Sequence, residues 1–89
     1  MKAVVTVVGK DKVGIISLVS AECAKYGANI LDISQTVMKE YFSMIMLVEL
    51  SDMNIEFALF AETLKKTGEE NGIDIRVMHE DIFNSMHRI

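Results

Sequence analysis

The segment KAVVTVVGKDKVGII occupies residues 2–16 and joins two hydrophobic patterns. Its first part, Lys2 to Val8, is a β-branched run typical of a short strand buried on both faces, and Gly9 closes it. From Gly14 to Tyr26 the apolar residues recur at helical spacing, and Gly27 follows as a helix cap. The predicted helix carries along one side Ile16, Val19, Cys23 and Tyr26, with Ile15 and Leu18 beside them.

Two further strand patterns follow the helix. Residues 28–38 (ANILDISQTVM) alternate in part, which favours an edge strand. The alternation predicts one face with Leu31, Ile33 and Val37 and another with Asp32, Ser34 and Thr36. After the short polar turn Lys39-Glu40, residues 41–50 (YFSMIMLVEL) are apolar on both faces, as expected of a central strand.

The rest of the chain repeats the order of helix and strand. Oxygen-bearing side chains at Ser51, Asp52 and Asn54 favour a helix start. Helical spacing then predicts a helix that contains Phe57, Phe60, Ala61 and Leu64 and is closed by Gly72. Alternation predicts a half-exposed strand through Ile73, Ile75 and Val77. Residues 81–89 predict a short amphipathic tail helix that presents Ile82, Phe83, Met86 and Ile89.

The order β-α-β-β-α-β plus a tail helix predicts an α+β fold, a ferredoxin-like βαββαβ sandwich. Right-handed crossovers put both helices on one face of a four-stranded antiparallel sheet, with the first and third strands in the middle. We expect one domain over residues 1–89, with the βαββαβ core at 1–79 and the C-terminal tail helix at 80–89. Apolar side chains on the open sheet face need cover, which either a partner subunit or the tail helix can supply.

Composition narrows the class of protein. The chain has 9 Lys and Arg against 13 Asp and Glu, and this acidic balance opposes nucleic-acid binding. No apolar run reaches membrane-spanning length and the first residues do not resemble a secretory signal, so we expect a cytoplasmic protein without a membrane partner. Cys23 is the single cysteine and fits a small buried hydrophobe. No Ser, Cys or Lys has an evident base beside it, so we expect neither catalysis nor a cofactor.

The loop of residues 9–16, GKDKVGII, connects a buried strand to a helix start. Unpaired backbone N–H groups and the positive end of the helix dipole favour an anion there. Gly9 and Gly14 allow a tight turn and close backbone approach. Asp11 either caps the helix or accepts hydrogen bonds from a ligand ammonium group. A simple capped turn and a carboxylate-binding loop therefore both fit the local residues.

A resemblance that extends beyond the loop adds to the interpretation of the loop as a binding site. The string GKDKVGII, the helix after it, Gly27 and then Ala28-Asn29-Ile30-Leu31 resemble the signature of the ACT domain, a small-molecule-binding regulatory module. The resemblance covers nearly the whole chain, and more narrowly the chain is similar to short free-standing bacterial ACT proteins and to ACT modules of the glycine-cleavage-repressor type. The resemblance implies a βαββαβ fold, a homodimer or higher homo-oligomer, an amino-acid ligand and a further, regulated protein.

The resemblance also implies a ligand site. In serine-sensing ACT modules the ligand lies between two subunits, held by the loop after the first strand and by an Asn at the start of the second, which Asn29 matches. Backbone amides of residues 12–15 would then hold an amino-acid carboxylate, while Asp11 and Asn29 would take its ammonium and polar groups. The implied ligand-binding set is Gly9, Lys10, Asp11, Lys12, Val13, Gly14, Ile15, Asn29 and Ile30. The chain departs from the serine-sensing pattern at Gly9 and Asp11, where that pattern has a ring-bearing polar residue and an amide.

Other proteins of this topology need residues that this loop lacks. An acylphosphatase needs a loop arginine, whereas Arg76 and Arg88 are distant in sequence. Copper chaperones need paired loop thiolates, and RNA-recognition domains need aromatic residues along the central strands. His79 and His87 flank two acidic residues, but nothing fixes a metal geometry, so we expect no metal. The remaining alternative is an interaction module that dimerises and modulates another protein without a ligand.

Overall fold

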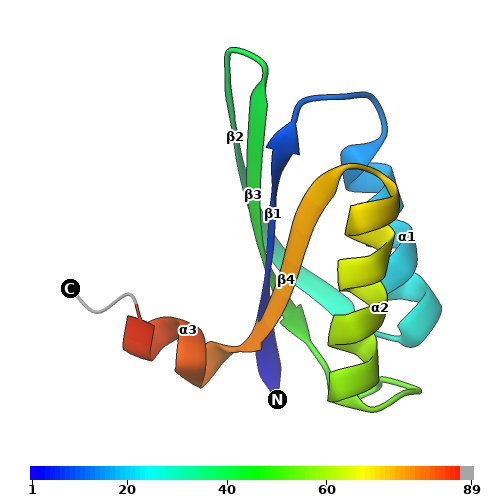
Figure 1. Ribbon diagram of the computed structural model, residues 1–89. Coiled ribbons are helices and arrows are strands. Elements are labelled where there is room, and N and C mark those ends of the chain that lie inside the picture. The colour runs from blue at the N-terminus through cyan, green and yellow to red at the C-terminus, as the bar shows by residue number, and fades with distance from the viewer. Residues whose placement is uncertain (87–89) are drawn as a thin grey trace.

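The computed structural model describes residues 1–86, and its elements follow the predicted order (Figure 1). They are β1 (Lys2–Lys10), α1 (Ile15–Tyr26), β2 (Asn29–Met38), β3 (Tyr41–Glu49), α2 (Phe57–Glu70), β4 (Ile73–His79) and α3 (Glu80–Met86). The strands form one antiparallel sheet in the order β2-β3-β1-β4. The predicted ferredoxin-like arrangement, with β1 and β3 in the middle, is confirmed.

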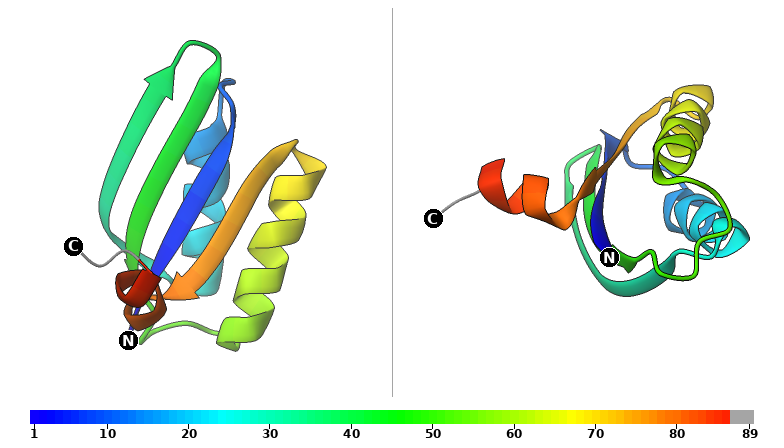
Figure 2. Two further views of the ribbon diagram at one scale, coloured as in Figure 1. Left: turned by 60° about the vertical axis from the view of Figure 1, so that its left-hand side comes forward. Right: turned by 90° about the horizontal axis from the view of Figure 1, so that it is seen from below.

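The helices α1 and α2 cover one face of the sheet, and α3 projects from the other side (Figures 1 and 2). Residues directly paired in an antiparallel sheet point to the same face, so the register assigns every strand residue. The face that packs on the helices carries the odd-numbered residues of β1 and the even-numbered residues of β3. We call the opposite face the open face; it carries the even-numbered residues of β1 and β4 and the odd-numbered residues of β3.

The core lies between the sheet and the two helices. Its largest fully buried side chains include, from the strands, Met44, Met46, Ile75, Val5 and Val7, and from the helices Phe60, Leu64, Val19 and Cys23. Tyr26 packs its ring edge against Phe60 at 6.2 Å between centroids, which links α1 to α2. The apolar spacing seen in the sequence therefore becomes a single layer of contacts between both helices and the inner positions of β1, β3 and β4.

The open face is covered at one end alone. Val4, at the end where α3 leaves the sheet, is 4% exposed, whereas Ile45 and Val8 are 44% and 52% exposed. The predicted tail helix therefore covers part of the face. Its described residues end at Met86, so the expected contribution of Ile89 lies outside the described residues.

Two local predictions about the first half of the chain are wrong. The first strand continues two residues beyond Val8, because Gly9 pairs with both neighbouring strands and Lys10 pairs with Tyr41. Ile16 was expected on the buried side of α1 but is 38% exposed. The buried helix stripe instead starts at Ile15 and continues at intervals of four residues, which matches the helical repeat better.

The strand β2 does not alternate in the predicted way. A β-bulge interrupts its pairing with β3 between Ile30 and Asp32, and Leu31 has no direct partner. Leu31 therefore falls out of phase with Ile33 and Val37, which lie on the helix-side face opposite Met46 and Phe42. Apart from Ile30, every residue of β2 is exposed, as expected of an edge strand.

The segment between β3 and α2 uses its polar residues differently from the prediction. The N-cap of α2 is Glu56, with no side-chain capping hydrogen bond. Asn54 instead donates from Nδ2 to the carbonyl of Lys25 at 3.1 Å, which ties this segment to the end of α1. The predicted capping role for Ser51, Asp52 and Asn54 is therefore wrong, because Ser51 donates to nearby Glu49 and Asn54 donates to Lys25.

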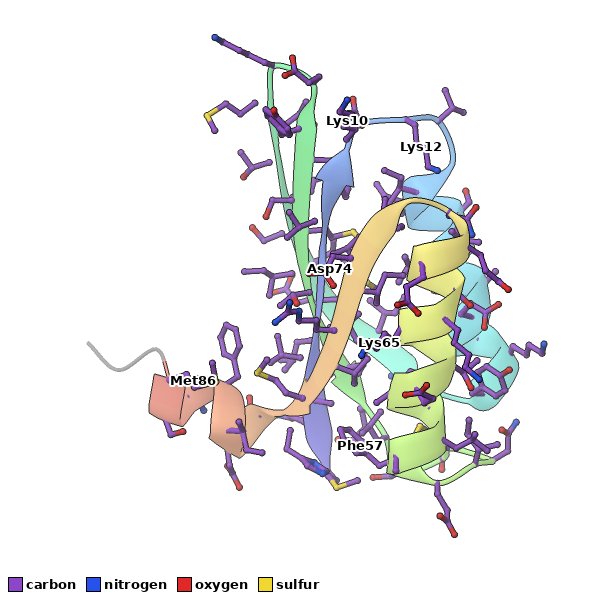
Figure 3. All side chains as sticks on the ribbon, viewed as in Figure 1. Lys10, Lys12, Phe57, Lys65, Asp74 and Met86 are labelled. Carbon is purple, nitrogen blue, oxygen red and sulfur yellow. The ribbon has the colours of Figure 1, made fainter. Side chains whose placement is uncertain are left out.

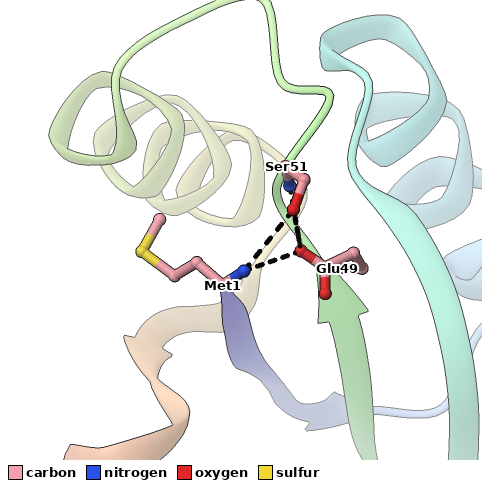
Figure 4. A network of polar contacts seen from close by, with 3 residues as sticks. All are labelled: Met1, Glu49 and Ser51. Atoms are coloured by element: carbon pink, nitrogen blue, oxygen red, sulfur yellow. Dashed lines mark hydrogen bonds and ion pairs between the residues drawn. The ribbon is translucent and has the colours of Figure 1, made fainter.

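Ser51 belongs to a polar network at the end of β3 (Figure 4). Its hydroxyl and backbone N–H donate to Glu49 Oε1 at 2.6 and 3.0 Å, and the N-terminal ammonium of Met1 lies 2.9 Å from the same oxygen. The Ser51 hydroxyl and the ammonium lower the pKa of Glu49 from 4.5 to about 2.

In residues 1–86 no helix is long and apolar enough to cross a membrane.

Candidate functional site

The loop between β1 and α1 is anchored at two points. The backbone N–H of Asp11 donates to the carbonyl of Glu40, in the β2–β3 turn, at 2.6 Å. The ammonium of Lys12 donates to the carbonyl of Asn71, the C-cap residue of α2 (Figure 3). A cation at a helix C-terminus is electrostatically favourable. The loop is therefore tied to the hairpin on one side and to α2 on the other.

The start of α1 has no internal cap. Gly14 is the N-cap residue, with a left-handed backbone (φ 92°), and its carbonyl accepts the first helical hydrogen bond from Leu18 at 2.9 Å. Within residues 1–86, no side chain accepts a hydrogen bond from the backbone N–H groups of residues 15–17. Asp11 could have capped the helix but does not. These N–H groups are therefore free to bind an anion.

A cleft of about 290 Å³ lies beside the uncapped helix start. The loop and α1 form one wall, and the helix-side face of the β2–β3 hairpin forms the other. The lining residues are Asp11, Lys12, Gly14, Ile15, Ile16, Ser17, Gln35, Val37 and Phe42. Four of the residues predicted from the sequence, Asp11, Lys12, Gly14 and Ile15, therefore meet at one cleft.

Asn29 and Ile30 lie elsewhere, at the opposite end of α1. They line a second cleft of about 410 Å³ together with Ser20, Ala24, Gly27 and Ala28. Since α1 has 12 residues and a helix rises 1.5 Å per residue, roughly 18 Å of helix separates the loop before α1 from Asn29 after it. One chain alone does not bring Asn29 to the loop.

The other three predicted residues line neither cleft. Gly9 is part of β1, and a Cβ atom there would lie 2.7 Å from Cγ2 of Ile73. That contact explains why a ring-bearing side chain does not occupy this position. Lys10 lies on the open face, away from α1 and α2, and Val13 is fully exposed in the loop.

Sequence reasoning missed the hairpin wall of the first cleft, above all Gln35, Val37 and Phe42. The two-residue turn Lys39-Glu40 contained the necessary signal, because it sets the pairing of Val37 with Phe42 and so places both on one face. Ile16 was missed because the sequence pattern placed it on the buried side of the helix, and Ser17 was missed because the predicted binding amides ended at residue 15.

The described side chains offer no evident reactive group at either cleft. Cys23 is fully buried, and burial raises the pKa of its thiol from 9.0 to about 11, so the nucleophilic thiolate is disfavoured. His79 stacks on Phe57 with 3.9 Å between ring centroids. Residues 1–86 contain no cluster of three or more His, Cys, Asp or Glu side chains suited to a metal, and His87 lies outside them. The first cleft has the groups to bind an anion next to an apolar group, which suits ligand binding and not catalysis.

Several known proteins are similar to this chain in sequence and in fold. The chain is 54% identical over 89 residues to the UPF0237 protein of Clostridium perfringens, covering 100% of both. An ACT domain protein from Streptococcus pneumoniae matches with a TM-score of 0.81 and 42% identity over 98% of each chain. A protein proposed to be a glycine cleavage system transcriptional repressor matches with a TM-score of 0.70 and 25% identity, over 86% of this chain and 44% of its own. Residues 2–78 match the family model of the ACT domain, so the chain belongs to the ACT domain family.

Proposed function

We propose that this protein binds a free amino acid as a regulatory ligand, at a site that two copies of the chain complete. ACT domains in general are regulatory, typically non-catalytic domains that bind small molecules and often dimerise. The observation that carries the finer proposal is the uncapped start of α1 beside a cleft of about 290 Å³. An α-amino acid brings the carboxylate that free N–H groups at a helix start favour.

The first cleft suits the carboxylate and the side chain of such a ligand. The N–H groups of residues 15–17 would donate to the carboxylate oxygens, with Gly14 leaving the approach open because nothing lies within 4 Å of its Cβ position. Val37 and Ile16 line the same cleft and are 53% and 38% exposed, so they would contact the apolar part of the ligand. Ligand binding would therefore cover apolar surface that the chain leaves open.

The free edge of β2 supports the dimer. Among residues 1–86, nothing pairs with the outer edge of β2. If two copies pair antiparallel about Gln35, Ile33 of each lies opposite Val37 of the other, on the helix-side face. Ser34 then lies opposite Thr36 on the open face. This register joins apolar to apolar and polar to polar, and the bulge at Leu31 lies outside its central five residues.

The same register would bring the two parts of the implied site together. An antiparallel pair about Gln35 sets the start of β2 in one copy close to the Lys39-Glu40 turn of the other. The loop is bonded to that turn through Asp11 and Glu40. Asn29 is opposite Glu49 in the register, so its side chain would turn round the edge of β2 and, with Asp11 of the other copy, offer polar groups to the ammonium of the same ligand. The roughly 18 Å that separates them within one chain is bridged by the twofold axis.

A thermal-shift screen against the common amino acids tests the proposal. A ligand at a hundred times its Kd stabilises the protein by about 2.7 kcal/mol, which raises the Tm of a domain of this size by roughly 10 °C or more. Asp11→Ala and Asn29→Ala are each expected to remove most of the shift, whereas the exposed Asp52→Ala should leave it intact. A shift that persists in both site variants would show that the ligand binds elsewhere.

The second candidate function is an interaction module without a ligand. It is favoured by the exposed apolar side chains on β2, namely Leu31, Ile33, Val37 and Met38. On this view the edge and its side chains bind another protein, and the loop is only a turn. No shift with any amino acid, together with capture of a regulated protein that Ile33→Lys abolishes, would favour it.

A further inference from the structure

The uncovered half of the open face is mostly apolar or neutral. It begins beyond Val4 and contains Ile45 and Val8, which are about half exposed, among the short side chains of Thr6, Ser34, Thr36 and Ser43. The flanking charges Asp74 and Arg76 pair with each other at 3.1 Å. Lys10 makes no ion pair or hydrogen bond with the described residues. The surface therefore combines an apolar centre with the unpaired Lys10 at its far end.

The helix α3 stands away from this face instead of lying along it (Figures 1 and 2). Ile82 and Met86 are 50% and 64% exposed, and Met86 lies at its outer end (Figure 3). With 7 residues, α3 is about 10 Å long. Two sheets that pack face to face are also about 10 Å apart. The length of α3 therefore matches the layer between two sheets.

We propose that a second copy of this chain packs open face on open face, with the strands of the two copies antiparallel across a twofold axis. Ile45 of each copy lies near the axis. Each α3 closes one end of the layer between the sheets, covering Val4 of its own copy and the Val8 end of the other. Ile82 and Met86 then contact the partner's sheet.

A second copy is favoured because the surface is complementary to itself. Val4 and Val8 are four residues apart, roughly 13 Å along the strand, which is too far for one α3 to cover both. Each chain thus has a helix at one end of the open face and lacks one at the other. In a twofold dimer, the α3 of each copy covers the end that the other copy leaves uncovered.

The charges agree with the same arrangement. The helix α3 begins with Glu80 and Asp81, and its described residues include no Lys or Arg. The antiparallel twofold places these carboxylates near Lys10 of the other copy, an unpaired lysine at the far end of the face. This interface uses neither the free edge of β2 nor the two clefts, so it goes beyond the proposed function and is independent of it. If both interfaces form, the assembly is a tetramer of two extended sheets.

The first test is sedimentation of Ile45→Arg against Leu59→Arg over a range of protein concentrations. Both side chains are about half exposed, so both variants should keep the wild-type circular dichroism spectrum and Tm. Ile45→Arg places two like charges near the axis and is expected to weaken self-association at least tenfold. Leu59→Arg, on α2, should associate as the wild type does. Equal association of Ile45→Arg and the wild type would overturn the proposal.

The second test is a charge reversal across the interface. Lys10→Glu alone should weaken association several-fold, and adding Asp81→Lys should restore it, because the pair is then reversed between copies. Lys66→Glu makes the same charge change on α2 and should have no effect. Absence of rescue in the double variant would contradict the placement of α3.

The third test separates this interface from the β2 edge. Ile33→Lys with Val37→Lys should abolish pairing at that edge and amino-acid binding but leave the open-face dimer. If that variant is monomeric while Ile45→Arg remains dimeric, the open-face proposal fails and the proposed function stands. If instead Ile45→Arg is monomeric and the β2 variant is dimeric, the open-face dimer is supported. The dimer at the β2 edge, which the proposed function needs, then does not form.

Discussion

At the scale of single residues, Gly27 and Gly14 share a left-handed backbone but have different surroundings. Both have a positive φ, at 79° and 92°, and a side chain in that conformation costs about 1 to 2 kcal/mol. A Cβ at Gly27 would also lie 2.5 Å from the backbone oxygen of Asp52, whereas a Cβ at Gly14 meets nothing within 4 Å. Gly27→Ala should therefore lower the free energy of unfolding clearly more than Gly14→Ala. Urea unfolding of the two variants measures the difference, and equal losses would mean that the Asp52 segment moves aside freely.

Glu49 gives the stability of the protein a pH dependence at the same scale. Its pKa falls from 4.5 to about 2, chiefly through the hydrogen bond from the Ser51 hydroxyl and then through the N-terminal ammonium. Since the folded state holds the carboxylate more strongly, the stabilisation is complete above pH 4.5 and is lost as the pH falls towards 2. Glu49→Gln should be less stable than the wild type at pH 7, and the difference should shrink between pH 4.5 and 2. Unfolding by urea across this range measures it, and a constant difference would contradict the assignment.

At the scale of elements, α2 separates a buried stripe from an exposed one. Leu64 is fully buried against the sheet, and Leu59, on the same helix, is 55% exposed. Leu64→Ala leaves a cavity and should cost about 2 to 5 kcal/mol of unfolding free energy. Leu59→Ala changes the helix propensity in the same way but leaves no cavity. It should therefore lower the free energy of unfolding by less than about 1 kcal/mol. Equal midpoints in urea would show that α2 is not held by this stripe.

The elements also show how far the sequence alone predicts this protein. The order of the strands followed from two runs that are apolar on both faces, since only central strands have such runs. The uncapped start of α1 could not be predicted, because Asp11 has the right side chain for a cap and only the tertiary bond to Glu40 directs the loop away from that geometry. The bulge at Leu31 and the separation of Asn29 from the loop likewise depend on pairing between strands distant along the chain. Local patterns therefore predicted the elements and half of the first cleft, and tertiary contacts determined the rest.

At the scale of the whole molecule, the two edges of the sheet differ in their protection. On the β4 edge, Gly68 of α2 is so close that a Cβ there would lie 2.6 Å from the oxygen of Ile73. The helix therefore packs directly on the backbone of β4, whereas β2 has no such neighbour among the described residues. Natural proteins protect or pair their edge strands. Pairing of β2 with a second copy would satisfy that requirement and complete the ligand site in one step.

Ligand binding and self-association should then be linked. If a site needs Asn29 from one copy and the loop from another, a saturating amino acid must strengthen association by the same factor by which association strengthens amino-acid binding. We expect the apparent Kd of the ligand to fall as protein concentration rises through the range where dimers form, and sedimentation with saturating ligand to show at least tenfold tighter association. Ile33→Lys with Val37→Lys should abolish both effects while keeping the fold, because both side chains are exposed. If that variant binds the amino acid with unchanged affinity, each chain holds a complete site of its own and Asn29 belongs to no shared one.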